Sequence, residues 1–444
     1  SRSARSSLSR GGASDSIDGV PRTCAIEQHG TVKAMALSTA ILTLGSLSLL
    51  FPSVGYPAGG NTSGRLMPPP AKLVLDLKRG ICIDRQFQAI PPDPRMRIAR
   101  EDIRSIKSMG FGFVKLIVNP EPLMSGSRLD TSGKRYLAEV VDRVVDEGLP
   151  VVVCIHPRWQ FKKAVFSDPD EFSRFIEFLG DMGRFLAAGW GPKKLVFQLM
   201  TEPGRNAMDW NDLLPRMWQV ARRAMPEHTL ILAGDKSGQI EGLLRTKPVN
   251  DSNVVYSFTF YEPFVLTFQG GRWRTPKWWS HLGSVPYPSS PRIAADRMPR
   301  ILERIPADPA GWRPAVKRVL TDYGNARWNR EKIAARIKEL ADWDRSYGGG
   351  LEIWCAEFGC YQRTIAPADR YRYIKDVREA FEENGIGWAY WSYNETFTVL
   401  NPVSRRPFTP PGADTDGIVD ADLLDALGLG RTKVRGRDPR QPGR

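Results

Sequence analysis

Eight short apolar segments recur along the chain, and they constrain its fold more than any other feature of the sequence. They are Leu73–Ile83, Phe113–Val118, Pro150–His156, Leu195–Glu202, Thr229–Ala233, Val254–Tyr261, Leu351–Glu357 and Ile386–Trp391. Most are continuous apolar runs rather than alternations of apolar and polar residues, which is the pattern of parallel strands buried on both faces. A chain of 444 residues is long enough to hold all of them in one domain with extensions.

Between these segments, apolar residues recur at helical spacing. The stripes are Leu137, Val140, Val141, Val144 and Val145; Phe172, Phe175, Ile176, Leu179, Met182 and Leu186; Ile333, Ile337 and Leu340; and Tyr371, Ile374, Val377 and Phe381. We interpret them as core-facing sides of helices. Eight strand–helix units predict an α/β fold of the closed (β/α)8 TIM barrel type. A doubly wound open sheet is the alternative, but no G-x-G-x-x-G motif follows the first strand.

One connection is unusually long. It runs from Tyr261, at the end of the sixth strand, to the helical stripe that begins near Arg330, and it is rich in Pro and Trp. A connection of this length in a compact domain usually has a function. Because the loops that follow strands lie on the active face of a barrel, we expect this long loop to lie there.

The predicted barrel domain covers 73–430, and the flanking segments differ from it in composition. We expect 1–34 to be a disordered basic extension, 35–52 a signal peptide or membrane anchor, 53–72 a linker and 431–444 a basic tail. Residues 36–51 form the longest uncharged stretch, and its length suits a secretory apolar region better than a membrane span. This predicts a secreted or periplasmic protein, with membrane anchoring through 36–51 as the alternative.

The formal net charge is +14, and the chain has five cysteines. No run of Lys and Arg interleaved with aromatic residues occurs in the body, so we interpret the charge as a solvated basic surface and expect no nucleic-acid binding. No C-x-x-C pair or zinc-ligand spacing occurs. Cys82, Cys154 and Cys355 are therefore expected to be buried free thiols, with a Cys355–Cys360 disulfide as the alternative. We expect no metal, no cofactor and a monomer.

Two of the predicted strands end in a glutamate. The fourth ends FQLMTEP with Glu202, and the seventh ends IWCAEFG with Glu357. All strands of a barrel end at one mouth, so both carboxylates should lie there. Burying an unpaired carboxylate is costly, so each glutamate either pairs with a neighbouring Arg or Lys or has a function. Two carboxyl groups about 5–5.5 Å apart would suit a glycosidase that acts by double displacement. A serine hydrolase is disfavoured because no G-x-S-x-G occurs.

Several stretches together resemble glycoside hydrolase family 5, the cellulase-like retaining β-glycanases. They are KRGICI, CIHP, MTEP, YSFTFYEPFVLTFQGGRW, AEFG, WAYWSYNETF and LLDALGL, in this order along the chain. The resemblance runs from about Leu73 to Leu429. It implies an endo-β-glucanase or cellulase-like enzyme that cleaves a β-linked glucan or a related polysaccharide.

The resemblance also implies roles for individual residues. Glu202 would be the general acid/base and Glu357 the nucleophile. Tyr261 would hydrogen-bond Glu357, His156 would contact sugar hydroxyls, and Trp391 would form a stacking platform beneath a sugar ring. The structural alternatives are a barrel-rim residue for Tyr261, a satisfied core histidine for His156 and plain core for Trp391.

Four positions depart from the family pattern. Thr201 stands where the family has the Asn that binds the sugar 2-hydroxyl, and Lys115 stands where it has an Arg on the second strand. Thr259 and Phe268 stand where relatives carry His. A lysine does not reproduce the bidentate contact of an arginine. These changes support a second hypothesis, a catalytically weakened barrel that binds polysaccharide during its synthesis or export.

The tryptophans of the long loop are further candidates for binding. The flat faces of Trp273, Trp278 and Trp279 suit the C–H faces of pyranose rings. The alternative is that they pack the loop onto the barrel, and the sequence supports both interpretations equally.

Overall fold

The computed structural model describes residues 71–430, apart from 74, 205–207, 308–310, 394–396 and 401–418. The predicted N-terminal extension, the signal or anchor segment, nearly all of the linker and the basic tail lie outside the described residues. Within the described part, no helix has both the length and the apolar character needed to cross a membrane.

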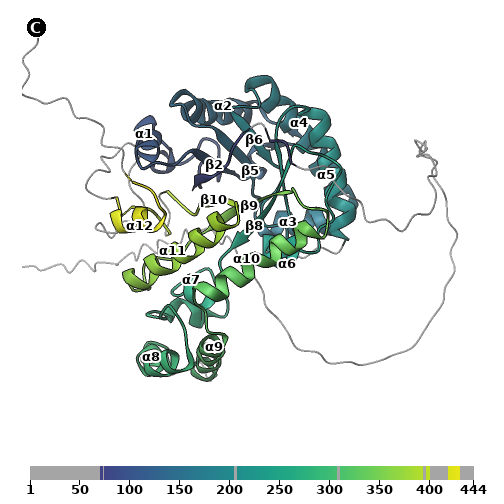
Figure 1. Cartoon of the computed structure of the whole chain (residues 1–444). Coiled ribbons are helices and arrows are strands. Elements are labelled where there is room, and N and C mark those ends of the chain that lie inside the picture. Colours follow the sequence, from purple (N-terminus) through teal and green to yellow (C-terminus); the bar gives the residue numbers. More distant parts are fainter. Residues whose placement is uncertain are drawn as a thin grey trace, which may run out of the picture.

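The centre of the described chain is a closed parallel barrel with the strand order β1-β10-β9-β8-β7-β6-β5-β2 (Figure 1). Its strands are β1 Arg79–Ile83, β2 Phe113–Val118, β5 Val151–Ile155, β6 Leu195–Gln198, β7 Leu230–Ala233, β8 Val254–Phe260, β9 Glu352–Phe358 and β10 Gly387–Tyr390. A two-stranded hairpin of β3 Met124–Ser125 and β4 Arg128–Leu129 follows β2. Each predicted segment overlaps one barrel strand, so the predicted (β/α)8 barrel is confirmed.

Helices surround the barrel (Figure 1). They are α1 Arg100–Ser108, α2 Thr131–Asp146, α3 Trp159–Ser167, α4 Pro169–Gly189, α5 Trp210–Ala224, α6 Ile240–Leu243, α7 Phe264–Thr267, α8 Pro291–Glu303, α9 Trp312–Ala326, α10 Arg330–Arg345, α11 Pro367–Glu383 and α12 Ala421–Ala426. Short 3-10 turns occupy Pro94–Met96, Glu121–Leu123, Lys236–Gly238 and Lys277–His281. The four predicted stripes belong to α2, α4, α10 and α11.

The first strand is shorter than predicted, because the residues before Arg79 do not pair in the barrel. The backbone N–H groups of Ala71 and Lys72 donate to the carbonyl oxygens of Gly350 and Ser252, at 2.6 Å each. Those two carbonyls lie just before β9 and β8. Leu77 is buried in the barrel interior, and Leu73 and Leu75 pack against it from that end. The apolar run that predicted a longer strand therefore closes the N-terminal end of the barrel.

Two apolar cores lie on opposite sides of the strands. The inner one consists of Leu77, Cys82, Phe113, Val152, Val196, Ile231, Val255, Trp354, Ala356 and Ala389. The other lies between the strands and the helices. Gly80 of β1 leaves room for the ring of Phe113, since a Cβ at Gly80 would lie 2.1 Å from that ring. The lower interior of the barrel is thus filled by side chains, as in other barrels of this type.

The long connection after β8 is not an irregular loop. It contains α7 and the two helices α8 and α9, which pack against each other and extend from the barrel (Figure 1). Pro299 inside α8 and the Pro-rich surroundings obscured the helices at the sequence level. Ser290 caps α8 by accepting a hydrogen bond from the N–H of Ile293, and Pro291 occupies its first position.

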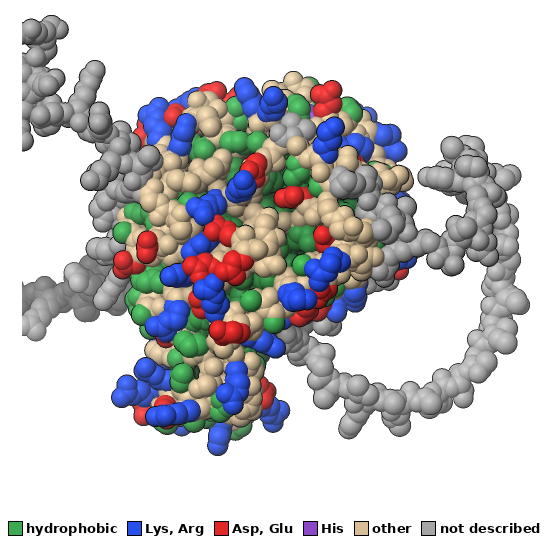
Figure 2. All heavy atoms as spheres, in the orientation of Figure 1, with side chains coloured by type: hydrophobic (Ala, Val, Ile, Leu, Met, Phe, Trp, Pro, Cys, Tyr) green, Lys and Arg blue, Asp and Glu red, His purple; other side chains and the backbone are tan. Residues whose placement is uncertain are grey.

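Figure 2 shows many Lys and Arg side chains and fewer Asp and Glu side chains over the hairpin of α8 and α9, and both signs of charge over the rest of the visible face. The exposed cations of the hairpin include Arg297, Arg300, Lys317 and Arg318. This distribution agrees with the interpretation of the net charge as a solvated basic surface.

The four described cysteines are Cys82, Cys154, Cys355 and Cys360, and all are buried free thiols. The prediction for the first three is confirmed, and the alternative Cys355–Cys360 disulfide does not form. Burial raises the pKa of Cys154 and of Cys360 to about 12. These thiols are therefore protonated and unreactive at neutral pH.

A buried ion pair fixes the C-terminal helix to the barrel. Arg370 of α11 donates to Asp420, the N-cap of α12, at 3.1 Å, and both side chains are 4% exposed. The same guanidinium donates to the hydroxyl of Tyr390 and to the carbonyl oxygens of Phe397 and Thr398. Arg370 thus connects α12 with the loop that follows β10.

We expect Asp420→Ala to lower the free energy of unfolding by about 3–5 kcal/mol, because it leaves a buried guanidinium without its counterion. Urea denaturation monitored by circular dichroism measures the change. Glu383→Ala, which removes one side of an exposed ion pair with Arg330, is the control and should leave the midpoint nearly unchanged. Equal midpoints for the two variants would contradict a structural role for the buried pair.

Candidate active site

A β-bulge in β9 decides where Glu357 points. Phe258 and Thr259 of β8 are consecutive, yet they pair with Cys355 and Glu357, which leaves Ala356 as an extra residue. On the other side, β10 shows a matching register shift. Strict alternation after the inward Trp354 would turn Glu357 toward the helices. The bulge instead turns it into the barrel, as bulges beside active sites commonly do.

Three side chains bind the carboxylate of Glu357 inside the barrel mouth. The Nζ of Lys115 donates to Oε1 at 2.7 Å, and the hydroxyl of Thr201 donates to the same oxygen at 3.3 Å. The hydroxyl of Tyr261 donates to Oε2 at 3.3 Å. Lys115 comes from β2, two residues after the inward Phe113, so it also points into the barrel. Three loops and strands distant in sequence therefore converge on one carboxylate.

Lys115 and Glu357 form an almost fully enclosed ion pair, with side-chain exposures of 0% and 3%. Burial by itself opposes the charge on Lys115, but the nearby Glu357 carboxylate favours it, and the pKa of the ammonium is raised. The ammonium also donates to the carbonyl oxygen of Ala356 at 3.1 Å. Lys115 is therefore charged at neutral pH.

Glu202 follows β6 at the same mouth, where the chain turns away from the barrel. Its backbone is in the left-handed region with φ of 50°, which is uncommon for a residue other than glycine. Lys162 of α3 is buried and donates to the carbonyl oxygens of Thr201 and Glu202, at 3.2 and 2.9 Å. Strained backbone of this kind persists where its surroundings hold it, and it is concentrated at functional sites.

His156 is the neighbour of Glu202 at the end of β5. Its Nε2 lies 3.7 Å from Oε2 of Glu202, which is longer than a hydrogen bond. Burial and then the positive charges of Lys162 and Lys115 hold the pKa of His156 well below its usual value. The imidazole is therefore neutral at neutral pH, and the contact is not an ion pair.

Aromatic side chains form a wall beside Tyr261. The ring centroids of Tyr261 and Phe268 lie 5.1 Å apart, and Phe397 contacts both rings. Trp273 packs edge-on against Phe268 and Tyr361 and remains half-buried. Phe268, which stands where relatives carry His, is thus one of the rings that support Tyr261.

The remaining predicted residues lie at or near the same mouth. Trp391 follows β10, is half-buried and packs against the inner core, and its backbone N–H donates to the carbonyl oxygen of Phe358 at 2.8 Å. Thr259 is buried and donates to the carbonyl oxygen of Ser237 at 3.4 Å. Trp278 and Trp279 are 5% and 7% exposed and stack on each other. Their burial favours the packing interpretation and leaves little ring face for a sugar.

Sequence reasoning missed two polar residues near these carboxylates. Lys162 lies at helical spacing with the buried Val165 and Phe166, and a lysine in such a stripe was a usable signal. Asp84 directly follows β1, which is the same signal that identified Glu202 and Glu357. Burial raises the pKa of Asp84, the Glu357 charge acts in the same direction, and Arg85 opposes both.

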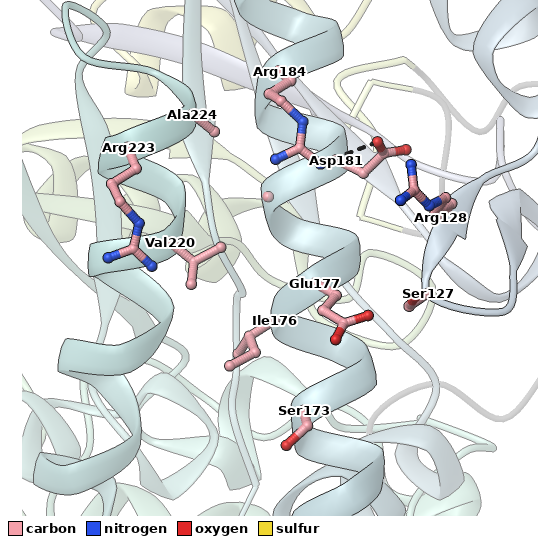
Figure 3. Close-up of a pocket in the computed structure, with 11 residues that line it drawn as sticks. Ser127, Arg128, Ser173, Ile176, Glu177, Asp181, Arg184, Val220, Arg223 and Ala224 are labelled. Atoms are coloured by element: carbon pink, nitrogen blue, oxygen red, sulfur yellow. Dashed lines mark hydrogen bonds and ion pairs between the residues drawn. The ribbon is translucent and has the colours of Figure 1, made fainter. Parts of the chain in front are cut away.

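A surface hollow of about 670 Å³ lies away from this site, between α4 and α5 and the β3–β4 hairpin. Figure 3 shows its lining, in which Arg184 pairs with Asp181 at 3.3 Å while Glu177, Arg128 and Arg223 add charges of both signs. None of the predicted site residues lines it. The hollow belongs to the outer helical layer and takes no part in the site at the strand ends.

A (β/α)8 barrel that holds two glutamates at the C-terminal ends of its strands has the architecture of the barrel glycosidases. Residues 92–396 match the cellulase family, glycosyl hydrolase family 5. The chain therefore belongs to glycosyl hydrolase family 5 and is a glycoside hydrolase of the cellulase-like type.

Individual relatives are distant. Endoglucanase C of Acetivibrio thermocellus is 23% identical over 325 residues, which cover 70% of this chain and 88% of that protein. The solved structure of the cellulose synthase subunit Z of Clostridioides difficile is 22% identical, with a TM-score of 0.60, and covers 79% of this chain and 99% of its own. Endoglucanase Cel5A of Thermotoga maritima is also 22% identical, with a TM-score of 0.59, over 79% and 97% of the two chains. At this identity the structural likeness supports the fold alone.

The enclosed ion pair should appear in a double-mutant cycle. Lys115→Met alone leaves a buried carboxylate without its cation and should cost about 3–5 kcal/mol of unfolding free energy. The double variant Lys115→Met/Glu357→Gln should lose at least ~2 kcal/mol less unfolding free energy than the sum of the losses in the two single variants. Urea unfolding gives all four values, independently of activity.

The matched control for this cycle replaces Glu352, at the opposite end of β9, by Gln. Lys115→Met and Glu352→Gln should add within about 0.5 kcal/mol, because the two sites share no partner. Additivity in the Lys115–Glu357 cycle would contradict the pairing.

The neutral His156 should make stability depend on pH. Its folded pKa lies below the value of about 6.5 expected for the unfolded chain, so the unfolded state binds more protons as the pH falls. Stability should therefore fall below pH ~6.5, by up to about 1.4 kcal/mol per pH unit from this group. His156→Gln should flatten the dependence between pH 7 and 5 in urea titrations. If His156→Gln keeps the wild-type slope, His156 is protonated equally in the folded and unfolded states, and the prediction is wrong.

Proposed function

We propose that this chain is a retaining glycoside hydrolase that cleaves β-linked glucan by double displacement, with Glu357 as nucleophile and Glu202 as acid/base. One observation carries the assignment of the nucleophile: the Glu357 carboxylate is bound by the ammonium of Lys115, 2.7 Å away. The ammonium holds this carboxylate in a fixed position inside the barrel mouth, and a positioned carboxylate is the group that attacks carbon in a double displacement. Glu202 instead lies beside an imidazole that burial keeps neutral.

In the first step, a carboxylate oxygen of Glu357 attacks the anomeric carbon while Glu202 gives its proton to the glycosidic oxygen. The bond between that oxygen and the anomeric carbon breaks, and the leaving sugar departs as an alcohol. In the second step, Glu202 takes a proton from water, the water oxygen attacks the anomeric carbon, and Glu357 is released. Two inversions give net retention of configuration.

The substrate class follows from the relatives and the site together. Several relatives are named endoglucanases, and one Thermotoga maritima Cel5A structure is described as a complex with cellobiose substrate. Tyr261, His156 and Trp391 supply hydroxyl, imidazole and aromatic groups around the two glutamates, which suits a sugar ring. The family match and the named relatives give no support to the second sequence hypothesis, a barrel that binds polysaccharide with weakened catalysis.

Turnover on a panel of carboxymethyl cellulose, barley β-glucan, lichenan and mannan tests the proposal. Glu357→Gln should lower kcat by more than about 10⁴-fold, and Glu202→Gln by about 10²–10⁴-fold. Glu352→Gln is the matched control, since it changes a half-buried glutamate at the other end of the same strand, and it should keep the wild-type rate.

Two further measurements test the mechanism. Proton NMR of the first product should show the β anomer. Sodium azide should restore turnover of an activated aryl cellobioside by Glu202→Ala and yield the β-azide, because azide attacks the glycosyl-enzyme without base assistance. An α product, or a wild type that hydrolyses no member of the panel, would refute the proposal.

A further inference from the structure

Trp159 has an exposure that sets it apart from the other large apolar side chains. It is the first residue of α3, three residues after His156, and it is 41% exposed. Among the described residues, the other large hydrophobic side chains are buried or half-buried. An isolated exposed tryptophan at the mouth of a barrel is a candidate for ligand binding, because its large apolar face costs free energy while it remains in water.

The indole of Trp159 lies directly against the loop that carries Glu202. A Cβ placed on Gly204 would lie 2.7 Å from Cζ3 of the indole, so a residue with a side chain at this position would displace the ring. Gly204 is two residues beyond Glu202. One part of the indole therefore packs on this loop, while the exposed part faces solvent beside it.

Helix α3 holds this arrangement in place through a second contact. Lys162 is three residues after Trp159, so the two side chains lie on the same face of the helix. The Lys162 ammonium binds the carbonyl oxygens of Thr201 and Glu202. The first turn of α3 is thus attached to the Glu202 loop by both an ammonium and an aromatic ring, which fixes the position of the indole relative to Glu202.

We propose that Trp159 is a stacking platform for the sugar unit that leaves with the glycosidic oxygen. This inference rests on the proposed function, in which Glu202 protonates that oxygen, so the departing sugar must lie on the Glu202 side of the site. A β-linked glucose unit presents flat C–H faces, and the exposed indole offers a matching apolar surface. Glu357 and Trp391 then contact the sugar on the other side of the cleaved bond.

The test compares two substrates that differ on the leaving side only. Cellohexaose places sugars there, whereas β-cellobiosyl fluoride has a single fluorine atom as its leaving group and reaches no side chain at that position. Trp159→Ala should lower kcat/KM at least about tenfold more for cellohexaose than for the fluoride. Trp159→Phe, which keeps an aromatic face, should recover most of the loss. Trp312→Ala, a half-buried tryptophan on the α8–α9 hairpin, is the control and should change neither value.

Calorimetric titration of cellohexaose into the Glu357→Gln enzyme, with and without Trp159→Ala, separates this proposal from the proposed function. Binding weakened about tenfold by Trp159→Ala supports the platform even if the wild type hydrolyses nothing. Equal losses on both substrates, or unchanged binding and turnover, would overturn the platform and leave the hydrolase proposal standing. A Glu357→Gln enzyme that binds no cellohexaose would overturn the platform, and together with a wild type that hydrolyses no member of the panel it would overturn both proposals.

Discussion

An ammonium and a carboxylate lie 2.7 Å apart inside the barrel mouth, and the surrounding structure is arranged around them. Removing two such charges from water costs several kcal/mol for each ion, and their attraction repays this only in good geometry with further hydrogen bonds. Thr201 and Tyr261 supply those bonds to Glu357. A buried pair of this kind contributes little to stability relative to an apolar core, so its presence at the mouth is best explained by chemistry.

The departures from the family pattern look different once the contacts are known. Lys115 of β2 supplies a positive charge to Glu357, as the family's arginine does. Unlike an arginine, it lacks the planar guanidinium that could donate two parallel hydrogen bonds. Thr201 donates to Glu357. Phe268 takes part in the aromatic wall around Tyr261. The changes therefore form a consistent local arrangement in which the carboxylate remains held.

The glutamate loop after β6 is supported from outside the barrel by α3. Lys162 satisfies two carbonyl groups of this loop, and Trp159 packs on Gly204. A rigid element that carries both an anchor and an exposed aromatic ring can position a substrate unit and an acid/base residue together, which lowers the entropy that binding must overcome. The hairpin of α8 and α9, by contrast, extends from the barrel and carries mostly basic, solvated side chains (Figure 2).

The sequence by itself determined the barrel, because buried parallel strands and amphipathic helices are written in local apolar patterns. It also placed Glu202 and Glu357 at the strand ends, since every strand of a barrel ends at the same mouth. It did not reveal α8, which has Pro299 in its interior, or the neighbouring α9. It also did not reveal that residues before Arg79 close the end of the barrel.

Only the tertiary structure decided which way Glu357 faces. The bulge at Ala356 arises from the register of β9 with β8 on one side and β10 on the other, so it depends on pairing partners about 30 to 100 residues away rather than on the local sequence. The same holds for Lys162 and Trp159, whose contacts with the Glu202 loop exist only after β5 and β6 are paired. The spacing of apolar residues along the chain determines which face of a helix or strand is buried. The packing of elements distant in sequence determines which polar side chains come into contact.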